Sequence, residues 1–139
     1  MASRILVVDD DIMTVRLLSQ ILQRQGYEVH VAYNGEEALL LARSLNPQLI
    51  ILDIMMPGLD GYQVCQRLKA SPDTADIVVL MLTAKGQVNE QTQGGKLVTL
   101  RMTEQMRGFA VGAADFVTKP VQAGFLLKRV ETLLWSGGA

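Results

Sequence analysis

Residues 48–58 read Gln-Leu-Ile-Ile-Leu-Asp-Ile-Met-Met-Pro-Gly. The apolar run at 49–52 predicts a short strand that is buried on both faces, as in a parallel sheet covered by helices. Asp53 ends this run, and Pro57 and Gly58 turn the chain. Open α/β sheets bind their ligands at the carboxyl ends of the strands, which is where Asp53 is expected. An aspartate in this place can also cap a loop or a helix, so its role depends on the other strands.

The composition is that of a globular α/β protein. The chain has 139 residues, of which 49% are hydrophobic and 19% charged, and we expect one domain over residues 1–139. A net charge of −1 gives no reason to expect direct nucleic-acid binding. The sequence shows no secretory signal and no apolar run near the ~18 residues of a membrane span. The single cysteine, Cys65, fits a reducing compartment, so we expect a cytoplasmic protein with no membrane contact.

Strand-like and helix-like patterns alternate along the rest of the chain. Short apolar or alternating runs predict further strands at residues 5–8, 27–32, 77–82 and 113–118. Amphipathic patterns predict helices at about residues 12–25, 36–45, 61–70, 103–112 and 122–135. Strands that alternate with helices imply right-handed βαβ units. The fold class predicted from these patterns is therefore α/β, with a doubly wound parallel sheet.

The segment at about 86–102 interrupts this rhythm. It is polar at first, contains Gly94-Gly95, and makes an unusually long connection between a strand and a helix. The glycine pair between β-prone residues favours a two-stranded ribbon over residues 88–102. An earlier start of the next helix is an alternative, although each glycine would cost that helix about 1 kcal/mol. A loop without regular structure or role is a third possibility.

Residues able to do chemistry follow four of the predicted strands. Asp9 and Asp10 follow the first, Asp53 the third, Thr83 the fourth and Lys119 the fifth. Because these are all carboxyl ends of parallel strands, we expect the side chains to converge. Three carboxylates in one crevice repel each other, and a hard divalent ion such as Mg²⁺ relieves this repulsion. A carboxylate can also attack phosphorus to give an aspartyl phosphate, whose oxygens a lysine and a hydroxyl can contact.

Four stretches then carry a family resemblance: Ile-Leu-Val-Val-Asp-Asp at 5–10, Leu-Asp-Ile-Met-Met-Pro-Gly-Leu-Asp-Gly at 52–61, Met-Leu-Thr-Ala at 81–84 and Phe-Val-Thr-Lys-Pro at 116–120. Together they resemble the receiver domain of bacterial two-component response regulators, including the chemotaxis regulators. The resemblance covers residues 3 to about 135 apart from the insert. It implies a flavodoxin-like (βα)5 fold with strand order 2-1-3-4-5 and an insert between strand 4 and helix 4.

The resemblance also implies roles for the acidic residues. Asp53 would be the phosphoacceptor. Mg²⁺ would be bound directly by Asp10, Asp53 and the backbone carbonyl of Met55, and Asp9 would act mainly through water. A histidine kinase or a phosphotransfer protein would donate the phosphoryl group. The domain would thus be a signalling phosphoacceptor and not an ordinary enzyme, catalysing only its own phosphotransfer and dephosphorylation.

Three further positions complete the implied switch. Thr83 and Lys119 would contact the phosphoryl group. Thr83 and Phe116 would relay its presence to a binding face. That face would bind an output protein, an effector domain or a second copy in a homodimer. Phe116 stands where tyrosine is commoner, and its ring has no hydroxyl to bond. Val121 follows Lys119-Pro120 where phenylalanine is frequent. The insert lies beside the usual output face, so the usual dimer surface is not assured.

Two other functions remain to be weighed. A phosphohydrolase of the haloacid-dehalogenase type also uses Asp, Thr or Ser, Lys and Mg²⁺, with an Asp-x-Asp-x-Thr pattern after the first strand. Here Asp9 and Asp11 fit the pattern, but Met13 stands in its last place, and the chain has no room for a cap domain. A phosphate-independent interaction module is the second alternative. The complete set of acids, hydroxyl and lysine argues against it, while the insert keeps it open.

Overall fold

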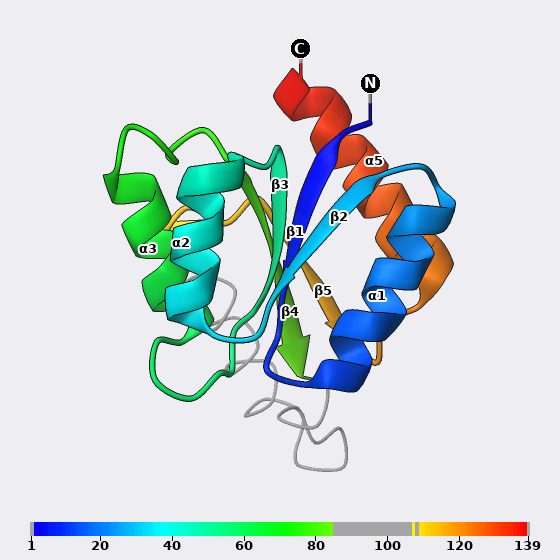
Figure 1. Cartoon of the computed structure of the whole chain (residues 1–139), viewed down its shortest axis with the longest axis horizontal. Coiled ribbons are helices and arrows are strands. Elements are labelled where there is room, and N and C mark those ends of the chain that lie inside the picture. The colour runs from blue at the N-terminus through cyan, green and yellow to red at the C-terminus, as the bar shows by residue number, and fades with distance from the viewer. Residues whose placement is uncertain (1, 85–106, 108, 139) are drawn as a thin grey trace, which may run out of the picture.

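The computed structural model describes residues 2–84, 107 and 109–138 of the chain. Within this part, five parallel strands form one sheet in the order β2-β1-β3-β4-β5 (Figure 1). The predicted fold class and strand order are confirmed. The strands are β1 (Arg4–Val8), β2 (Glu28–Ala32), β3 (Leu49–Asp53), β4 (Val78–Ala84) and β5 (Asp115–Lys119), and the helices are α1 (Ile12–Arg24), α2 (Gly35–Leu45), α3 (Gly61–Ala70) and α5 (Ala123–Gly138).

Helices cover both faces of the sheet, with α1 and α5 on one side and α2 and α3 on the other (Figure 1). Side chains alternate between the two faces along each strand. In β1, Leu6 belongs to the core beneath α2 and α3, whereas its neighbour Ile5 belongs to the core beneath α1 and α5. In β3, Ile50 and Ile51 divide in the same way. This double burial explains why the strands read as unbroken apolar runs.

Polar residues fix where the helices begin. The side chains of Asp11, Asn34 and Asp60 accept hydrogen bonds from backbone N–H groups in the first turns of α1, α2 and α3. Asp60 and Gln63 complete a reciprocal capping box. The chain between β3 and α3 turns at Gly58, whose φ of 77° lies in the region that favours glycine. The carboxyl ends of the strands and the first turns of the following helices therefore lie at the same edge of the sheet.

Several predicted boundaries need correction. The last helix is predicted to end at about residue 135, but α5 continues to Gly138. Glycine lowers helix propensity without removing backbone hydrogen bonds. β5 extends to Lys119 because β4 continues to Ala84, which pairs with it. Residues 107, 109 and 110 are helical, as the predicted helix at 103–112 requires. The proposed ribbon at 88–102 and the start of that helix lie outside the described residues.

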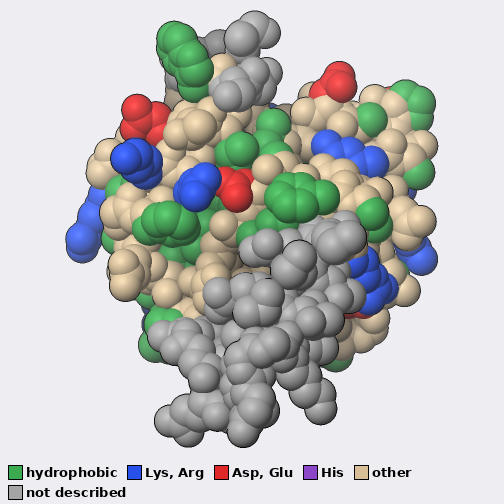
Figure 2. Space-filling view, turned by 180° about the vertical axis from the view of Figure 1, so that it is seen from behind, with side chains coloured by type: hydrophobic (Ala, Val, Ile, Leu, Met, Phe, Trp, Pro, Cys, Tyr) green, Lys and Arg blue, Asp and Glu red, His purple; other side chains and the backbone are tan. Residues whose placement is uncertain are grey.

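The described surface is mixed in character. On the face shown in Figure 2, basic, acidic and hydrophobic side chains are interspersed over the described part and are not gathered by charge sign. This agrees with the net charge of −1. Among the described helices, none has both the length and the hydropathy that a membrane crossing would need.

Candidate functional site

The carboxyl ends of β1, β3 and β5 meet around one lysine. Lys119, the last residue of β5, places its Nζ atom 2.7 Å from Oδ2 of Asp9 and 3.4 Å from Oδ1 of Asp53. Asp9 follows β1 directly, and Asp53 is the last residue of β3. The strand register produces this meeting, because β1 pairs with β3, β3 with β4 and β4 with β5. The predicted convergence of these three residues is observed.

Asp9 is completely buried, and its two oxygens have different surroundings. Oδ1 accepts a hydrogen bond from the backbone N–H of Asp11 at 3.0 Å. Oδ2 lies 2.7 Å from Nζ of Lys119 and forms an ion pair with it. A buried carboxylate is costly unless it has such a partner. Asp9 therefore holds Lys119 at the site.

Asp53 is almost completely buried, with 2% of its surface exposed. Burial and, next, the negative charge of Asp9 raise its pKa to about 7, although Lys119 and the N–H of Met55 pull the value down. The Met55 N–H points to Asp53 Oδ1 over a long 3.4 Å. A carboxyl with this pKa is partly protonated near neutral pH when no metal is bound, which is unusual for an aspartate.

Asp10 lies next to Asp9 in the chain but is exposed, since alternate residues at a strand end face opposite ways. Partial burial and a hydrogen bond with Asp9 raise the pKa of Asp10. One carboxylate oxygen from each of Asp9, Asp10 and Asp53 lies within 4.8 Å of the others. Three crowded oxygens, two of them on carboxyls with raised pKa values, are the donor set that a hard divalent cation stabilises. The residues present thus fit the predicted Mg²⁺.

The positive charge on Lys119 is stabilised by the neighbouring carboxylates. Burial by itself disfavours an ammonium, but the hydrogen bond and charge of Asp9 and the charge of Asp53 outweigh it and raise the pKa of Lys119. The side chain is 24% exposed, so the ammonium lies at the wall of the site and not in open solvent. It can therefore neutralise negative charge that enters the crevice.

The other predicted residues lie around this centre. Thr83, in β4, is half-buried, and its Oγ1 lies 3.5 Å from Oγ1 of Thr118 on β5. Met55 is exposed at the rim, with 54% of its surface accessible. Phe116 is buried on β5 in the core beneath α2 and α3, three residues before Lys119.

Two residues that matter for the site carried little sequence signal. A Cβ atom on Gly61 would lie 2.5 Å from the carbonyl oxygen of Asp53, so only glycine lets α3 begin against the end of β3. Phe109 packs edge-on against Phe116, with ring centroids 4.9 Å apart and an interplanar angle of 83°. Gly61 belongs to the motif at 52–61, but the motif does not reveal its contact with Asp53. The contact of Phe109 depends on tertiary packing that spacing cannot reveal.

Comparison with known proteins points to one protein family. The family model described as "Response regulator receiver domain" matches residues 5–131. The DNA-binding dual master transcriptional regulator RpaA of Synechocystis sp. is 44% identical over 131 residues, which cover 94% of this chain and 48% of that protein. Response regulator PleD of Caulobacter vibrioides is 41% identical over 133 residues, covering 96% of this chain and 26% of PleD. The chain thus spans about half and about a quarter of these relatives.

Solved structures agree with the sequence relatives. The chemotaxis protein CheY4 of Vibrio cholerae superposes with a TM-score of 0.78 at 30% identity, over 96% of this chain and 99% of that one. The family model spans the five strands from Ile5 onward together with the acidic residues at their carboxyl ends. The chain therefore belongs to the response regulator receiver domain family of two-component signal transduction.

Proposed function

We propose that Asp53 is the phosphoacceptor of this receiver domain. The observation that carries this proposal is the position of Asp53, buried at the end of β3 with Lys119 Nζ 3.4 Å from Oδ1. A carboxylate oxygen of Asp53 attacks the donor phosphorus, a bond from oxygen to phosphorus forms, and the bond from phosphorus to the leaving group breaks. The Lys119 ammonium offsets charge on the phosphoryl oxygens, and the Thr83 hydroxyl donates a hydrogen bond to one of them.

The same crevice is proposed to bind Mg²⁺ through Asp10, Asp53 and the backbone carbonyl of Met55, with Asp9 acting mainly through water. When bound, Mg²⁺ supplies positive charge against the crowded carboxylates and the phosphoryl oxygens. Support comes from the three carboxylate oxygens within 4.8 Å of one another and from the raised pKa values of Asp10 and Asp53. Asp9, already paired with Lys119, then keeps the lysine in place.

We also propose how the domain acts in a signalling pathway. The donor is a histidine kinase or phosphotransfer protein, the domain catalyses its own phosphotransfer and dephosphorylation, and it acts in the cytoplasm. Thr83 and Phe116 relay the phosphorylated state to a surface that binds an output protein, an effector domain or a second copy. Residues 1–139 constitute one receiver domain with an insert at about 86–102. RpaA is described as DNA-binding, whereas for this receiver domain itself we propose no direct nucleic-acid contact.

Mass spectrometry after incubation with acetyl phosphate and Mg²⁺ tests the phosphoacceptor. The wild type is expected to gain one phosphate mass, and Asp53→Asn, which keeps the shape but removes the nucleophile, is expected to gain none. Asp10→Asn is the matched comparison: it should gain phosphate slowly, because it lacks a metal ligand but keeps the nucleophile. A full phosphate gain in Asp53→Asn would refute the assignment.

Melting experiments test the metal independently of phosphorylation. Mg²⁺ at about 100 times its Kd should stabilise the wild type by roughly 2.7 kcal/mol, because it binds only the folded site. Asp10→Ala should lose most of this increment. An equal Mg²⁺ effect on wild type and Asp10→Ala would refute this metal site while leaving the phosphoacceptor open.

A further inference from the structure

A second pocket lies at the amino ends of the strands, opposite the acidic site. Its cavity is about 500 Å³ and is lined by Ser3, Tyr27, Glu131, Thr132, Leu134 and Trp135. Ser3 precedes β1, Tyr27 precedes β2, and the other four residues belong to the last turns of α5. We call this pocket the α5 groove. Since β1 runs from the groove to Asp9, the groove and the acidic site lie at opposite edges of the sheet.

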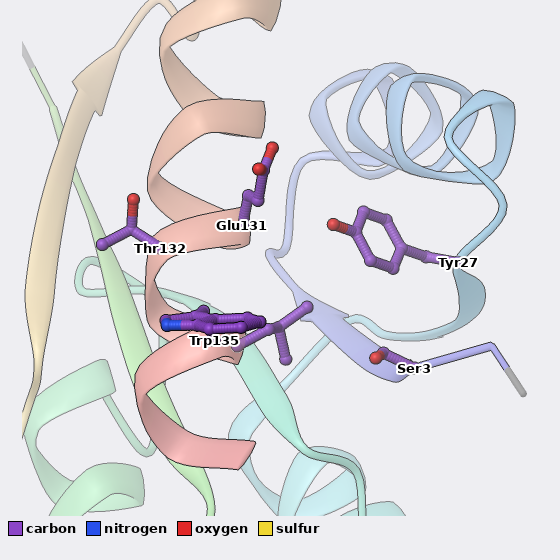
Figure 3. Close-up of a pocket in the computed structure, with 6 residues that line it drawn as sticks. Ser3, Tyr27, Glu131, Thr132 and Trp135 are labelled. Atoms are coloured by element: carbon purple, nitrogen blue, oxygen red, sulfur yellow. The ribbon is translucent and has the colours of Figure 1, made fainter. Parts of the chain in front are cut away.

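Trp135 is the most unusual residue of the α5 groove. It is the only tryptophan of the chain, and 82% of its surface is exposed. Glu131 precedes it by four residues, so the two side chains are neighbours on one face of α5. Figure 3 shows the indole nearly edge-on, with Glu131 and the Tyr27 hydroxyl on the same side of the ring plane. The exposed indole thus lines the same groove as a carboxylate and a phenol.

The charges around the groove favour a cation. Among the described residues that line the groove, Glu131 is the only charged one, and no described side chain forms an ion pair with it. Arg129, two residues earlier on α5, is occupied by Asp115 at 3.0 Å. Burial and the charge of Glu131 raise the pKa of Tyr27, so its hydroxyl keeps its proton and its hydrogen-bonding capacity at neutral pH. Among the described lining residues, a positively charged ligand would therefore meet one carboxylate and no opposing cation.

We propose that the α5 groove binds the arginine side chain of a partner protein. A planar guanidinium can stack on the exposed indole of Trp135 and donate N–H hydrogen bonds to Glu131. A lysine ammonium cannot stack in this way and is more strongly hydrated, so it binds less well. The Tyr27 hydroxyl accepts a further N–H of the same plane. The volume of about 500 Å³ is large enough for the side chain together with its flanking backbone.

Emission from the only tryptophan reports on the groove directly. The wild type is titrated with N-acetyl-arginine methylamide at constant ionic strength, in parallel with the lysine and citrulline analogues. Citrulline has nearly the shape of arginine but no charge. A saturable change is expected with arginine, a several-fold weaker one with lysine and none with citrulline. A linear response to arginine, or equal responses to arginine and citrulline, would overturn the proposal.

Variants assign the binding to the named residues. Glu131→Gln is expected to weaken arginine binding about tenfold, because a hydrogen bond to a charged group is lost. Glu36→Gln makes the same change at an exposed position on α2 and should leave binding unaltered. Trp135→Leu, followed by amide chemical shifts around Ser3 and Tyr27, should show lost binding in a folded protein. Unaltered binding in Glu131→Gln or in Trp135→Leu would refute the arginine site.

The proposal does not depend on the phosphorylation chemistry. Asp53→Asn should bind the arginine analogue as the wild type does, because the acidic site is at the other end of β1. Glu131→Gln should still gain phosphate at Asp53. Failure of one site would thus be distinguishable from failure of the other.

Discussion

Lys119 lies closer to Asp9 than to Asp53: its Nζ atom is 2.7 Å from Asp9 Oδ2 and 3.4 Å from Asp53 Oδ1. The lysine is thus held by a completely buried carboxylate beside the carboxyl that we propose as phosphoacceptor. Its ammonium needs to move little to reach an oxygen of a phosphoryl group on Asp53. The pair Lys119–Asp9 therefore prepares the site for added negative charge.

Removing the charge of Lys119 should reduce both phosphorylation and stability. In Lys119→Met, two buried carboxylates lose their cation, and breaking such a pair typically costs about 3–5 kcal/mol. Removing the lysine charge raises the pKa of Asp53 further, so ionising this carboxyl destabilises the fold more. The loss of unfolding free energy should therefore be greater at pH 8, where the carboxyl is driven to ionise, than at pH 5. Urea unfolding at both pH values measures this. Lys128→Met, at an exposed position on α5, is the control and should change stability little. Equal stabilities of Lys119→Met and Lys128→Met at pH 8 would contradict the expectation.

The raised pKa of Asp53 predicts how stability depends on pH. The folded value of about 7 lies above the ordinary 3.8, so without metal the folded state binds the proton more tightly than the unfolded state. Stability contributed by this group is complete below pH 3.8 and declines as the pH rises toward 7. Asp53→Asn should abolish this decline and be more stable than wild type at pH 8, by on the order of 2–4 kcal/mol.

Chelator-treated protein unfolded between pH 4 and 8 provides the measurement for Asp53. Asp73→Asn, at an exposed aspartate after α3, should keep the wild-type slope. Parallel curves for wild type and Asp53→Asn across this range would show that the carboxyl is not perturbed in solution.

Gly61 should tolerate no side chain. A Cβ atom there would come within 2.5 Å of the carbonyl oxygen of Asp53 and 2.7 Å of Cα of Ile54, both backbone atoms that cannot rotate away. Gly61→Ala is expected to destabilise by at least about 2 kcal/mol through backbone displacement and to slow phosphorylation at Asp53. Gly124→Ala is the matched control, because a Cβ at Gly124 meets nothing within 4 Å. That variant should be neutral or slightly stabilising, since alanine favours the helix. Thermal melts would contradict the argument if both variants melted alike.

The contact between Phe109 and Phe116 should be measurable as a coupling energy. Edge-to-face rings with centroids 4.9 Å apart contribute about 0.5–1.5 kcal/mol beyond the area they bury. A double-mutant cycle with Phe109→Leu and Phe116→Leu should give a coupling in this range. The same cycle with Phe125→Leu in place of Phe109→Leu should give none, because Phe125 lies on α5 and stacks with Arg129. Additive changes in both cycles would mean that the ring pair does not form in solution.

Much of the acidic site follows from local features of the sequence. Apolar runs ended by Asp9, Asp53 and Lys119 predicted buried parallel strands, and parallel strands bring their carboxyl ends together whatever the remaining packing. Asp11 and Asp60 cap α1 and α3, and such capping is open to prediction from sequence because it depends on residues a few positions apart. The family resemblance rests on the same stretches.

Tertiary structure alone decided the finer arrangement. The pairing of Lys119 with Asp9, the burial of Asp9 beside the exposed Asp10, and the Cβ-free approach of Gly61 to Asp53 depend on strand register and on backbone segments distant in sequence. The α5 groove likewise joins Ser3 and Tyr27 to Trp135, which lie more than a hundred residues apart. The spacing of apolar residues indicates which face of a helix or strand is buried, but contacts between elements form only when the whole chain packs.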